Sequence, residues 1–510
     1  MATSTSMELA MMGYESDGQQ KLFYSNLNIE KRIPKEHILR QIKSKIDFDF
    51  IYFQVKDTYG IKGNVSVPPP VILKMMLLLV LYNVRSEREL MDTIPLRLDW
   101  LWFLGYDIDT ETPDHSVLSK ARRRWGVEAF KTFFERIVWQ CVDAGLVSED
   151  KLFVDSSLVD ANASNNSVVD THSLKRYLNE RYRFLEERLD DVKAHKTTPA
   201  NSRHISITDP DASVVRHSGG KSKLRYKTHR GVDPKHEVIT ATKMTPGSVD
   251  EGHLLVEMIE LHEHNTQTSP DTVVADSRYG KTENYLLCHD LGKKAHITSL
   301  EKTQRGTGRQ KGIFPKEAFT YHPETDTFTC PAGHTLKRRH HHRKRNHYEY
   351  IASPGTCSRC ELRDRCTRAK DARTLKRHVR QDDLDTMLKD ANSRQAKMDI
   401  KYRQHLSERS FAQSCTFGYK RARWRRLWRV EIQDFLIASI QNILILLRHA
   451  KDRARSKANA QIEHQRRALK SFRLLLRIPF AGKATRAKLA RVVGYLFVVF
   501  NRRNCEPGII

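Results

Sequence analysis

The sequence lacks an apolar run long enough to cross a bilayer. Its longest apolar runs are Val71–Val84 and Val492–Phe500, and both fall short of the roughly 20 residues that a membrane-spanning helix needs. The first twenty residues also lack a basic segment followed by an apolar one, so we expect no signal peptide. These absences favour a cytoplasmic protein without a membrane partner.

Cysteine is scarce, with eight residues in 510. Four of them, Cys141, Cys288, Cys415 and Cys505, are scattered and are expected to be buried apolar side chains. Because no secretion signal is evident, we do not expect a disulfide framework. The other four cysteines lie close together in the sequence and are considered below.

Acidic residues are few relative to basic ones. The chain has 88 Lys and Arg against 61 Asp and Glu, a net charge of +27. Such an excess predicts a polyanionic partner, of which nucleic acid is the commonest. An acidic membrane surface and general basicity are the alternatives.

The length predicts two to four structural units. We expect an all-helical N-terminal domain at 1–145 and an α/β domain at 146–447, followed by a basic, helical C-terminal tail at 448–510. A small insertion rich in Gly, Lys and Arg, at 301–375, would interrupt the α/β domain. Near the N-terminus, Pro68–Ile94 predicts a buried helix, a turn and a second helix that Ser86 caps.

The N-terminal helices have two interpretations. A helix, a short turn and then a basic helix that carries Arg122, Arg123 and Arg124 form the outline of a helix-turn-helix DNA-binding unit. The same pattern also fits a plain helical bundle.

Strands alternate with helices after residue 150. The expected strands are Leu152–Val159, Lys223–Val232, Glu237–Met244, Thr272–Ala275 and Lys294–Ser299. A turn rich in Gly, Asp and Pro joins the second and third, which predicts a hairpin. His229 and His236 flank that turn and are expected at the surface. The later strands are expected to be parallel in a mixed α/β layer.

Two of these strands end in Asp-Ser, at Asp155 and Asp276. Either Asp alone could simply cap a helix or a turn. Since the ends of neighbouring strands in an α/β sheet converge, the two carboxylates are expected to meet. Mg²⁺ would relieve their repulsion, and a pair of such ions can drive attack on a phosphodiester. Glu408, on a basic and aromatic helix, is the candidate third carboxylate. Asp160 is a rival to Asp155, but it lies past the expected strand end and is expected to be a polar cap.

The clustered cysteines follow the spacing of a metal site. Cys357 and Cys360 form a Cys-x-x-Cys pair, and Cys330 and Cys366 would complete a tetrahedral Cys₄ zinc site. His334 is an alternative ligand, and free thiols are the alternative interpretation. Zinc would be structural, folding an insertion that is too small and too basic for a core of its own.

Taken together, these segments resemble the bacterial insertion-sequence DDE transposases. The matching segments are FVDSSLVDANAS, TDPDASVV followed by GGKSKLRYKTH, VVADSRYG, the cysteine cluster and YRQHLSERSFAQ. The helical block from PPPVILKMM to SKARRRWG resembles the N-terminal domain of that family. These segments cover most of residues 45–447, and the ordered set is specific.

The resemblance implies an RNase H-like catalytic core in which Asp155, Asp276 and Glu408 hold two Mg²⁺ or Mn²⁺ ions. It also implies cleavage and transfer of DNA strands at terminal inverted repeats, by a homodimer in the synaptic complex of the bacterial nucleoid. Related enzymes often have a Lys seven residues after the Glu, where this chain has Cys415. Lys420 and Arg421 follow soon after and would substitute for it.

Basic and aromatic residues around these segments are expected to contact DNA. They are Arg122, Arg123, Arg124, Lys223, Lys227, Tyr402, Arg403, Arg409, Lys420 and Arg421. Two other functions remain open: a non-catalytic DNA-binding protein derived from a transposase, and an RNase H-like DNA endonuclease.

Overall fold

The computed structural model describes residues 12–13, 28–60, 64–170, 199–216, 220–299 and 312–475. The chain divides into two compact units, Met1–Leu446 and Leu447–Ile510. The part of the expected C-terminal tail beyond residue 475 lies outside the described residues.

The N-terminal region is helical, as predicted. Its helices are α1 (Ile29–Arg32), α2 (Ile38–Lys45), α3 (Phe50–Val55), α4 (Pro69–Leu81), α5 (Glu87–Thr93), α6 (Leu98–Leu104), α7 (Ser116–Trp125) and α8 (Glu128–Asp143). Helix α4 is apolar on every side and almost wholly buried, as expected for a central core helix. Ser86 caps α5 by accepting a hydrogen bond from the Glu89 N–H at 3.1 Å, which confirms the predicted cap.

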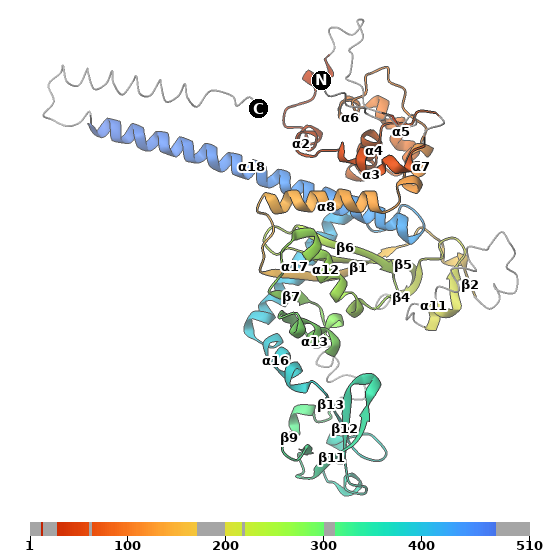
Figure 1. Ribbon diagram of the computed structural model, residues 1–510, viewed down its shortest axis with the longest axis vertical. Helices are drawn as coiled ribbons and strands as arrows, with labels where there is room; N and C mark the ends of the chain where they lie inside the picture. Colours follow the sequence, from red (N-terminus) through yellow and green to blue (C-terminus); the bar gives the residue numbers. More distant parts are fainter. Residues whose placement is uncertain are drawn as a thin grey trace, which may run out of the picture. The chain divides into compact units, whose positions relative to one another are not determined.

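A six-stranded central sheet follows (Figure 1). Its strands are β1 (Lys151–Asp160), β4 (Ser213–Arg216), β5 (Ser222–Val232), β6 (Ile239–Pro246), β7 (Thr272–Ala275) and β8 (Lys294–Ile297). The order is β4-β5-β1-β7-β8, with β6 also paired to β5. The hairpin β5–β6 is antiparallel, whereas β1, β7 and β8 are parallel. All five predicted strands are present, and β4 was not predicted.

The two faces of β1 have different partners. Leu152 and Val154 belong to the apolar core that also contains residues of α12 (Leu255–Thr266) and α13 (Thr282–Asp290). Because side chains alternate along a strand, Phe153 and Asp155 point to the opposite face. Helix α17 (Arg394–Thr416) covers that face, where Tyr402 contacts the Phe153 ring at 5.7 Å.

The cysteine-rich insertion forms a separate five-stranded antiparallel sheet, which the sequence did not predict (Figure 1). Its strands are β9 (Thr320–His322), β10 (Thr327–Thr329), β11 (Thr335–His342), β12 (His347–Ala352) and β13 (Thr374–His378). A small core of Phe319, Phe328, Leu336, Tyr350 and Leu375 lies on one face. The expectation that this insertion has no core of its own is therefore wrong.

Two further long helices follow the insertion, after α15 (Arg363–Cys366). They are α16 (Gln381–Ala391), which precedes α17, and α18 (Leu427–Leu475). Small elements elsewhere are β2 (Val168–Asp170), α11 (Pro199–Arg203) and β3 (His204–Ser206). Within the described residues, only Leu427–Arg453 is long and apolar enough to cross a membrane. Its apolar window is 83% buried inside the protein, as in the core helix of a soluble protein.

The expected surface position of His229 is wrong. Its side chain is fully buried, and its Nε2 lies 2.9 Å from Thr245 Oγ1. His262 on α12 is also buried, with Nδ1 2.7 Å from Thr240 Oγ1. Burial lowers the pKa of His229 to about 3 and the pKa of His262 to about 4.

Because these two histidines are buried and neutral, we expect the free energy of unfolding to fall as the pH drops from 7 to 4. An unfolded histidine titrates near pH ~6.5. Below that pH the unfolded state binds protons that the folded state excludes, and each histidine costs up to about 1.4 kcal/mol per pH unit. Denaturant unfolding at pH 7, 6 and 5 measures this slope. His229→Gln should flatten it, whereas His464→Gln, at an exposed position, should not. Equal slopes in all three proteins would contradict the prediction.

Candidate active site

Two of the three predicted catalytic carboxylates lie side by side. Strands β1 and β7 are parallel, and their last paired residues are Phe153 and Val274. Two residues further along each strand come Asp155 and Asp276. Because both side chains have the same parity as that pair, they project on the face that α17 covers. The sheet register therefore brings the two Asp residues together.

Asp276 also caps a turn. It directly follows β7, and its side chain accepts a hydrogen bond from the Arg278 N–H at 3.0 Å. That bond begins the short 3-10 helix Ser277–Tyr279. The capping interpretation of this Asp is thus correct, and it is compatible with a place in the site.

The environment disfavours two bare negative charges here. Burial raises the pKa of Asp155, an effect that the Arg403 guanidinium partly offsets from 2.6 Å away. Burial also raises the pKa of Asp276, and the nearby carboxylates of Glu251 and Asp155 raise it further. Carboxylates that repel each other in a partly buried site suit a divalent cation with oxygen ligands. The residues therefore fit the cation that the sequence predicted.

Helix α17 turns Arg403 and Ser407, rather than Glu408, toward Asp155. Arg403 is buried and ion-paired with Asp155, and Ser407 is also buried and close enough to Asp155 to lower its pKa. Glu408 is exposed, and its Oε1 accepts a hydrogen bond from Gln404 at 3.3 Å. The structure does not bring Glu408 into contact with the Asp pair, and its catalytic role stays a prediction.

A different glutamate is close to the pair, and the sequence reasoning missed it. Glu251 lies in the turn after β6, is buried, and forms an ion pair with the buried Lys227 at 2.8 Å. Its negative charge raises the pKa of both Asp155 and Asp276. The sequence does contain an Asp-Glu pair, in TPGSVDEG after a predicted strand, that could have indicated a site residue. The same residues are also typical of the start of an ordinary helix, so they did not single out Glu251.

Asp160 is not a second candidate for this position. It lies five residues further along β1, and Lys223 and Arg225 each form an ion pair with it at 2.8 Å. These hydrogen bonds lower the pKa of Asp160 despite partial burial. The expectation that it caps an element is wrong, because it pairs with basic side chains within the sheet.

Three of the basic residues expected to contact DNA are buried. Arg122 pairs with Glu87 at 2.5 Å, Lys227 pairs with Glu251, and Arg403 pairs with Asp155. Their charges are matched inside the protein, so the structure contradicts direct contacts with phosphate for these three.

The other predicted contact residues reach the surface. Arg123, Arg124, Lys223, Tyr402, Arg409, Lys420 and Arg421 are exposed. Of these, Arg409 pairs with Glu237 at 2.6 Å, and the Tyr402 hydroxyl donates to the Pro234 carbonyl at 3.0 Å. Lys420 and Arg421 adjoin Asp160 at the end of β1. Five residues of strand separate them from Asp155, about 16 Å.

Arg122 instead joins the helical region to the segment before α18. Its guanidinium stacks on the Trp424 ring at 4.0 Å. The Trp424 indole N–H donates to Glu87 at 3.0 Å, so both residues share one carboxylate. This contact explains why Arg122 is buried.

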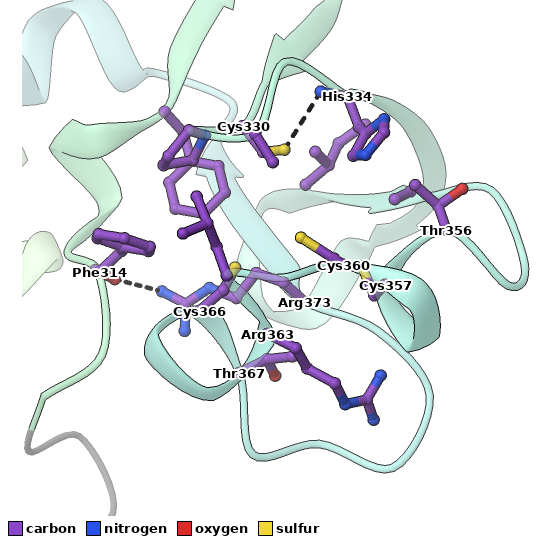
Figure 2. A pocket seen from close by; sticks show the side chains of 16 residues that line it. Phe314, Cys330, His334, Thr356, Cys357, Cys360, Arg363, Cys366, Thr367 and Arg373 are labelled. Carbon is purple, nitrogen blue, oxygen red and sulfur yellow. Dashed lines mark hydrogen bonds between the residues drawn. The ribbon is translucent and has the colours of Figure 1, made fainter.

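The four clustered cysteines line one small cavity in the insertion (Figure 2). Cys330 follows β10, Cys357 and Cys360 lie in the loop after β12, and Cys366 ends α15. Burial raises the pKa of the Cys366 thiol, and the other three cysteines raise it further. The His334 backbone N–H donates to Cys330 Sγ at 3.3 Å. Four thiols around one cavity fit the donor set of a structural zinc ion.

Neither metal site is formed as a ready set of ligands. Across the described ranges, no three His, Cys, Asp or Glu side chains are grouped closely enough to hold a metal ion. The structure therefore does not confirm zinc or magnesium, and both remain proposals that rest on the donor residues described above.

Two family models match the chain. A transposase domain model (DUF772) matches residues 27–124, which span the N-terminal helices up to α7. A transposase DDE domain model matches residues 329–447, which include the four clustered cysteines, α17 and the start of α18. No curated protein matches the chain. Asp155 and Asp276 lie between the two matched segments, so the matches do not test their roles.

Proposed function

Because the chain belongs to the insertion-sequence DDE transposases, we propose that it binds the terminal inverted repeats of its own element. We further propose that it catalyses divalent-metal-dependent cleavage and transfer of DNA strands. The proposal rests mainly on the position of Asp155 beside Asp276, on neighbouring parallel strands that α17 covers. An RNase H-like core is supported by the strand order, with the antiparallel hairpin β5–β6 on one side of β1 and parallel strands on the other.

In this proposal Asp155 and Asp276 hold the catalytic metal, and Glu408 completes the site when DNA is bound. Two Mg²⁺ or Mn²⁺ ions would supply the positive charge that activates water and stabilises the phosphodiester as charge develops. Ser407 orients the Asp155 carboxylate, and Arg403 balances its charge. Hydrolysis of a phosphodiester frees a 3′-OH at the element end. This hydroxyl then attacks a target phosphodiester, forming a bond to its phosphorus and releasing the 3′-OH of the cut target strand.

The DNA contacts are assigned to the exposed basic residues. Arg123 and Arg124 on α7 would contact the inverted repeat, and Lys420 and Arg421 would contact phosphates of the strand that leads to Asp155. Two element ends must be paired for strand transfer, so the active form would be a homodimer on DNA. The protein would act in the bacterial cytoplasm, at the nucleoid.

The direct test is a cleavage and strand-transfer assay on DNA that carries the ends of the parent element. Reactions with Mg²⁺ are compared with reactions in EDTA. Metal-dependent cutting followed by joining supports a transposase. Cutting without joining would indicate an endonuclease, and end-specific binding without cutting in any metal would indicate a non-catalytic DNA-binding protein.

Zinc in the insertion has its own test. We propose that Cys330, Cys357, Cys360 and Cys366 hold a structural Zn²⁺, because they surround one cavity. Purified wild type should contain about one zinc per chain. Cys357→Ser and Cys360→Ser should abolish zinc binding and lower the unfolding temperature, since metal binding and folding are coupled in such modules. Elemental analysis and thermal unfolding measure both effects.

The control for zinc is Cys415→Ser, which changes a cysteine of α17 outside the cluster. It should leave the zinc content unchanged. Wild-type protein that is produced in zinc-supplemented medium and still contains no zinc would contradict the assignment.

A further inference from the structure

We propose that Glu251 is a positioning residue for the catalytic metal, because it holds two cationic side chains in place beside Asp276. The inference rests on the proposed function, in which Asp155 and Asp276 bind a divalent cation. It adds a fourth carboxylate to the Asp155, Asp276 and Glu408 set, one that supports the site without acting as a ligand.

Glu251 is the shared partner of two cations. Its Oε1 lies 2.8 Å from Lys227 Nζ and 3.2 Å from Arg278 Nη1. The side chains of Glu251 and Lys227 are each only 7% exposed. A buried charge is costly unless it is paired, and Oε1 of this carboxylate already pairs with both Lys227 and Arg278. It is therefore poorly suited to bind a metal directly.

The turn that carries Glu251 is docked against the turn that carries Asp276. Asn284 on α13 donates to the carbonyls of Gly252 and Tyr279, at 2.9 and 2.8 Å. A side chain at Gly252 would meet the Arg278 carbonyl at 2.9 Å, so only glycine permits this approach. The two turns thus behave as one rigid unit.

Arg278 connects Glu251 to Asp276. Its backbone N–H donates to Asp276 Oδ1 at 3.0 Å, while its guanidinium pairs with Glu251. Tyr279, the next residue, is completely buried, and its hydroxyl has no hydrogen-bond partner among the described residues. Its pKa is raised by burial and then by Glu251, Asp155 and Asp276.

The charge balance explains what Glu251 contributes. Without its negative charge, Lys227 and Arg278 would be unpaired cations beside Asp276. Their positive charge, at the two packed turns that carry Glu251 and Asp276, would repel a divalent cation. Residues that support a metal ligand in this way typically change the affinity for the metal about 10–100-fold when they are replaced.

The experiment measures metal binding without catalysis. The unfolding temperature of the full chain is recorded against the concentration of Mn²⁺, which gives a midpoint for stabilisation by the metal. Glu251→Gln should raise this midpoint about tenfold. Glu257→Gln is the matched control, since Glu257 also pairs with a lysine, Lys243, but lies on α12. It should not move the midpoint.

A second variant separates positioning from simple loss of stability. Arg278→Gln in the Glu251→Gln background removes one freed cation and should return the midpoint part of the way to that of wild type. A purely structural defect would not be relieved by a second substitution. An unchanged midpoint in Glu251→Gln, or no relief in the double variant, would overturn the inference. Wild type that Mn²⁺ does not stabilise, or stabilisation that survives Asp276→Asn, would overturn the proposed metal site as well.

Discussion

Asp155→Asn and Asp276→Asn should each lower the rate of DNA strand cleavage by at least about 10³-fold. The divalent cation that the two carboxylates would hold contributes several kcal/mol to stabilisation of the transition state, and each 1.36 kcal/mol is about tenfold in rate. Single-turnover cleavage of an element-end DNA, with Mg²⁺ in excess, measures the loss. An Asn variant that cleaves at near the wild-type rate would exclude that Asp as a ligand.

Fold and DNA binding should survive in both variants. The pKa of each Asp is raised by burial, and that of Asp276 also by neighbouring carboxylates, so the charged pair destabilises the folded state. Asp276→Asn removes this repulsion, so its unfolding temperature should stay the same or rise. Asp155→Asn leaves the buried Arg403 without its ion-pair partner, so its unfolding temperature should fall. Loss of DNA binding in proportion to cleavage would indicate a folding defect instead.

Glu408→Gln is the variant that the structure makes most informative. Glu408 is exposed on α17 and does not contact the Asp pair. If DNA binding draws it into the site, its replacement should lower the cleavage rate as much as Asp155→Asn does. Full activity of Glu408→Gln would contradict its predicted role and leave the two Asp residues as the carboxylate ligands.

The sheet could be predicted because its strands carry strong local signals. Strands β1 and β7 each contain a short apolar run, Leu152–Val154 and Val273–Ala275, and the Gly-Val-Asp-Pro turn fixes the hairpin. The expectation that both strands end at the Asp is wrong for β1, which continues to Asp160. Taking the two Asp-Ser strands as parallel neighbours nevertheless places Asp155 beside Asp276. Local pattern and sheet geometry agree here, which is why the prediction succeeded.

The rotation of α17 could not be predicted, because its buried face is mostly polar. Arg403, Ser407, Ser410 and Ser414 face the sheet, with Leu406 among the few buried apolar residues. An apolar stripe normally reveals which face of a helix is buried. When the buried face of a helix is held by hydrogen bonds and ion pairs instead, hydrophobic periodicity does not indicate which face is buried. Which of Arg403, Ser407 and Glu408 faces the acids is then decided by partners distant in sequence.

The same limit explains the buried basic residues. Arg122, Lys227 and Arg403 look like surface cations in the sequence, yet each pairs with a carboxylate from another segment. The sheet of the insertion was missed for a related reason. Strand β11 has the sequence TLKRRHHH, and only Leu336 is buried. Its sequence therefore lacks the alternation of apolar and polar residues that is typical of a strand.

Arg230→Met should lower the free energy of unfolding by about 3–5 kcal/mol, the cost of breaking a buried ion pair. Arg230 lies on β5 directly opposite Asp155, is 1% exposed, and pairs with Asp434 of α18 at 3.4 Å. It also donates to Ser414 Oγ at 2.6 Å and to Gln441 Oε1 at 3.0 Å. Without the guanidinium, Asp434 would be a buried, uncompensated charge. Denaturant unfolding of wild type and variant gives the difference.

Arg409→Met is the matched control, because Arg409 forms an even shorter ion pair, 2.6 Å from Glu237, but is 58% exposed. Exposed pairs contribute about 0–1 kcal/mol, so this variant should be nearly as stable as wild type. Arg230→Met combined with Asp434→Asn should recover part of the loss, since the unpaired charge is then gone. Equal effects of Arg230→Met and Arg409→Met would contradict the prediction. Because Arg230 ties β5 to α17 and α18 beside Asp155, its loss should also loosen the helix that carries Arg403 and Ser407.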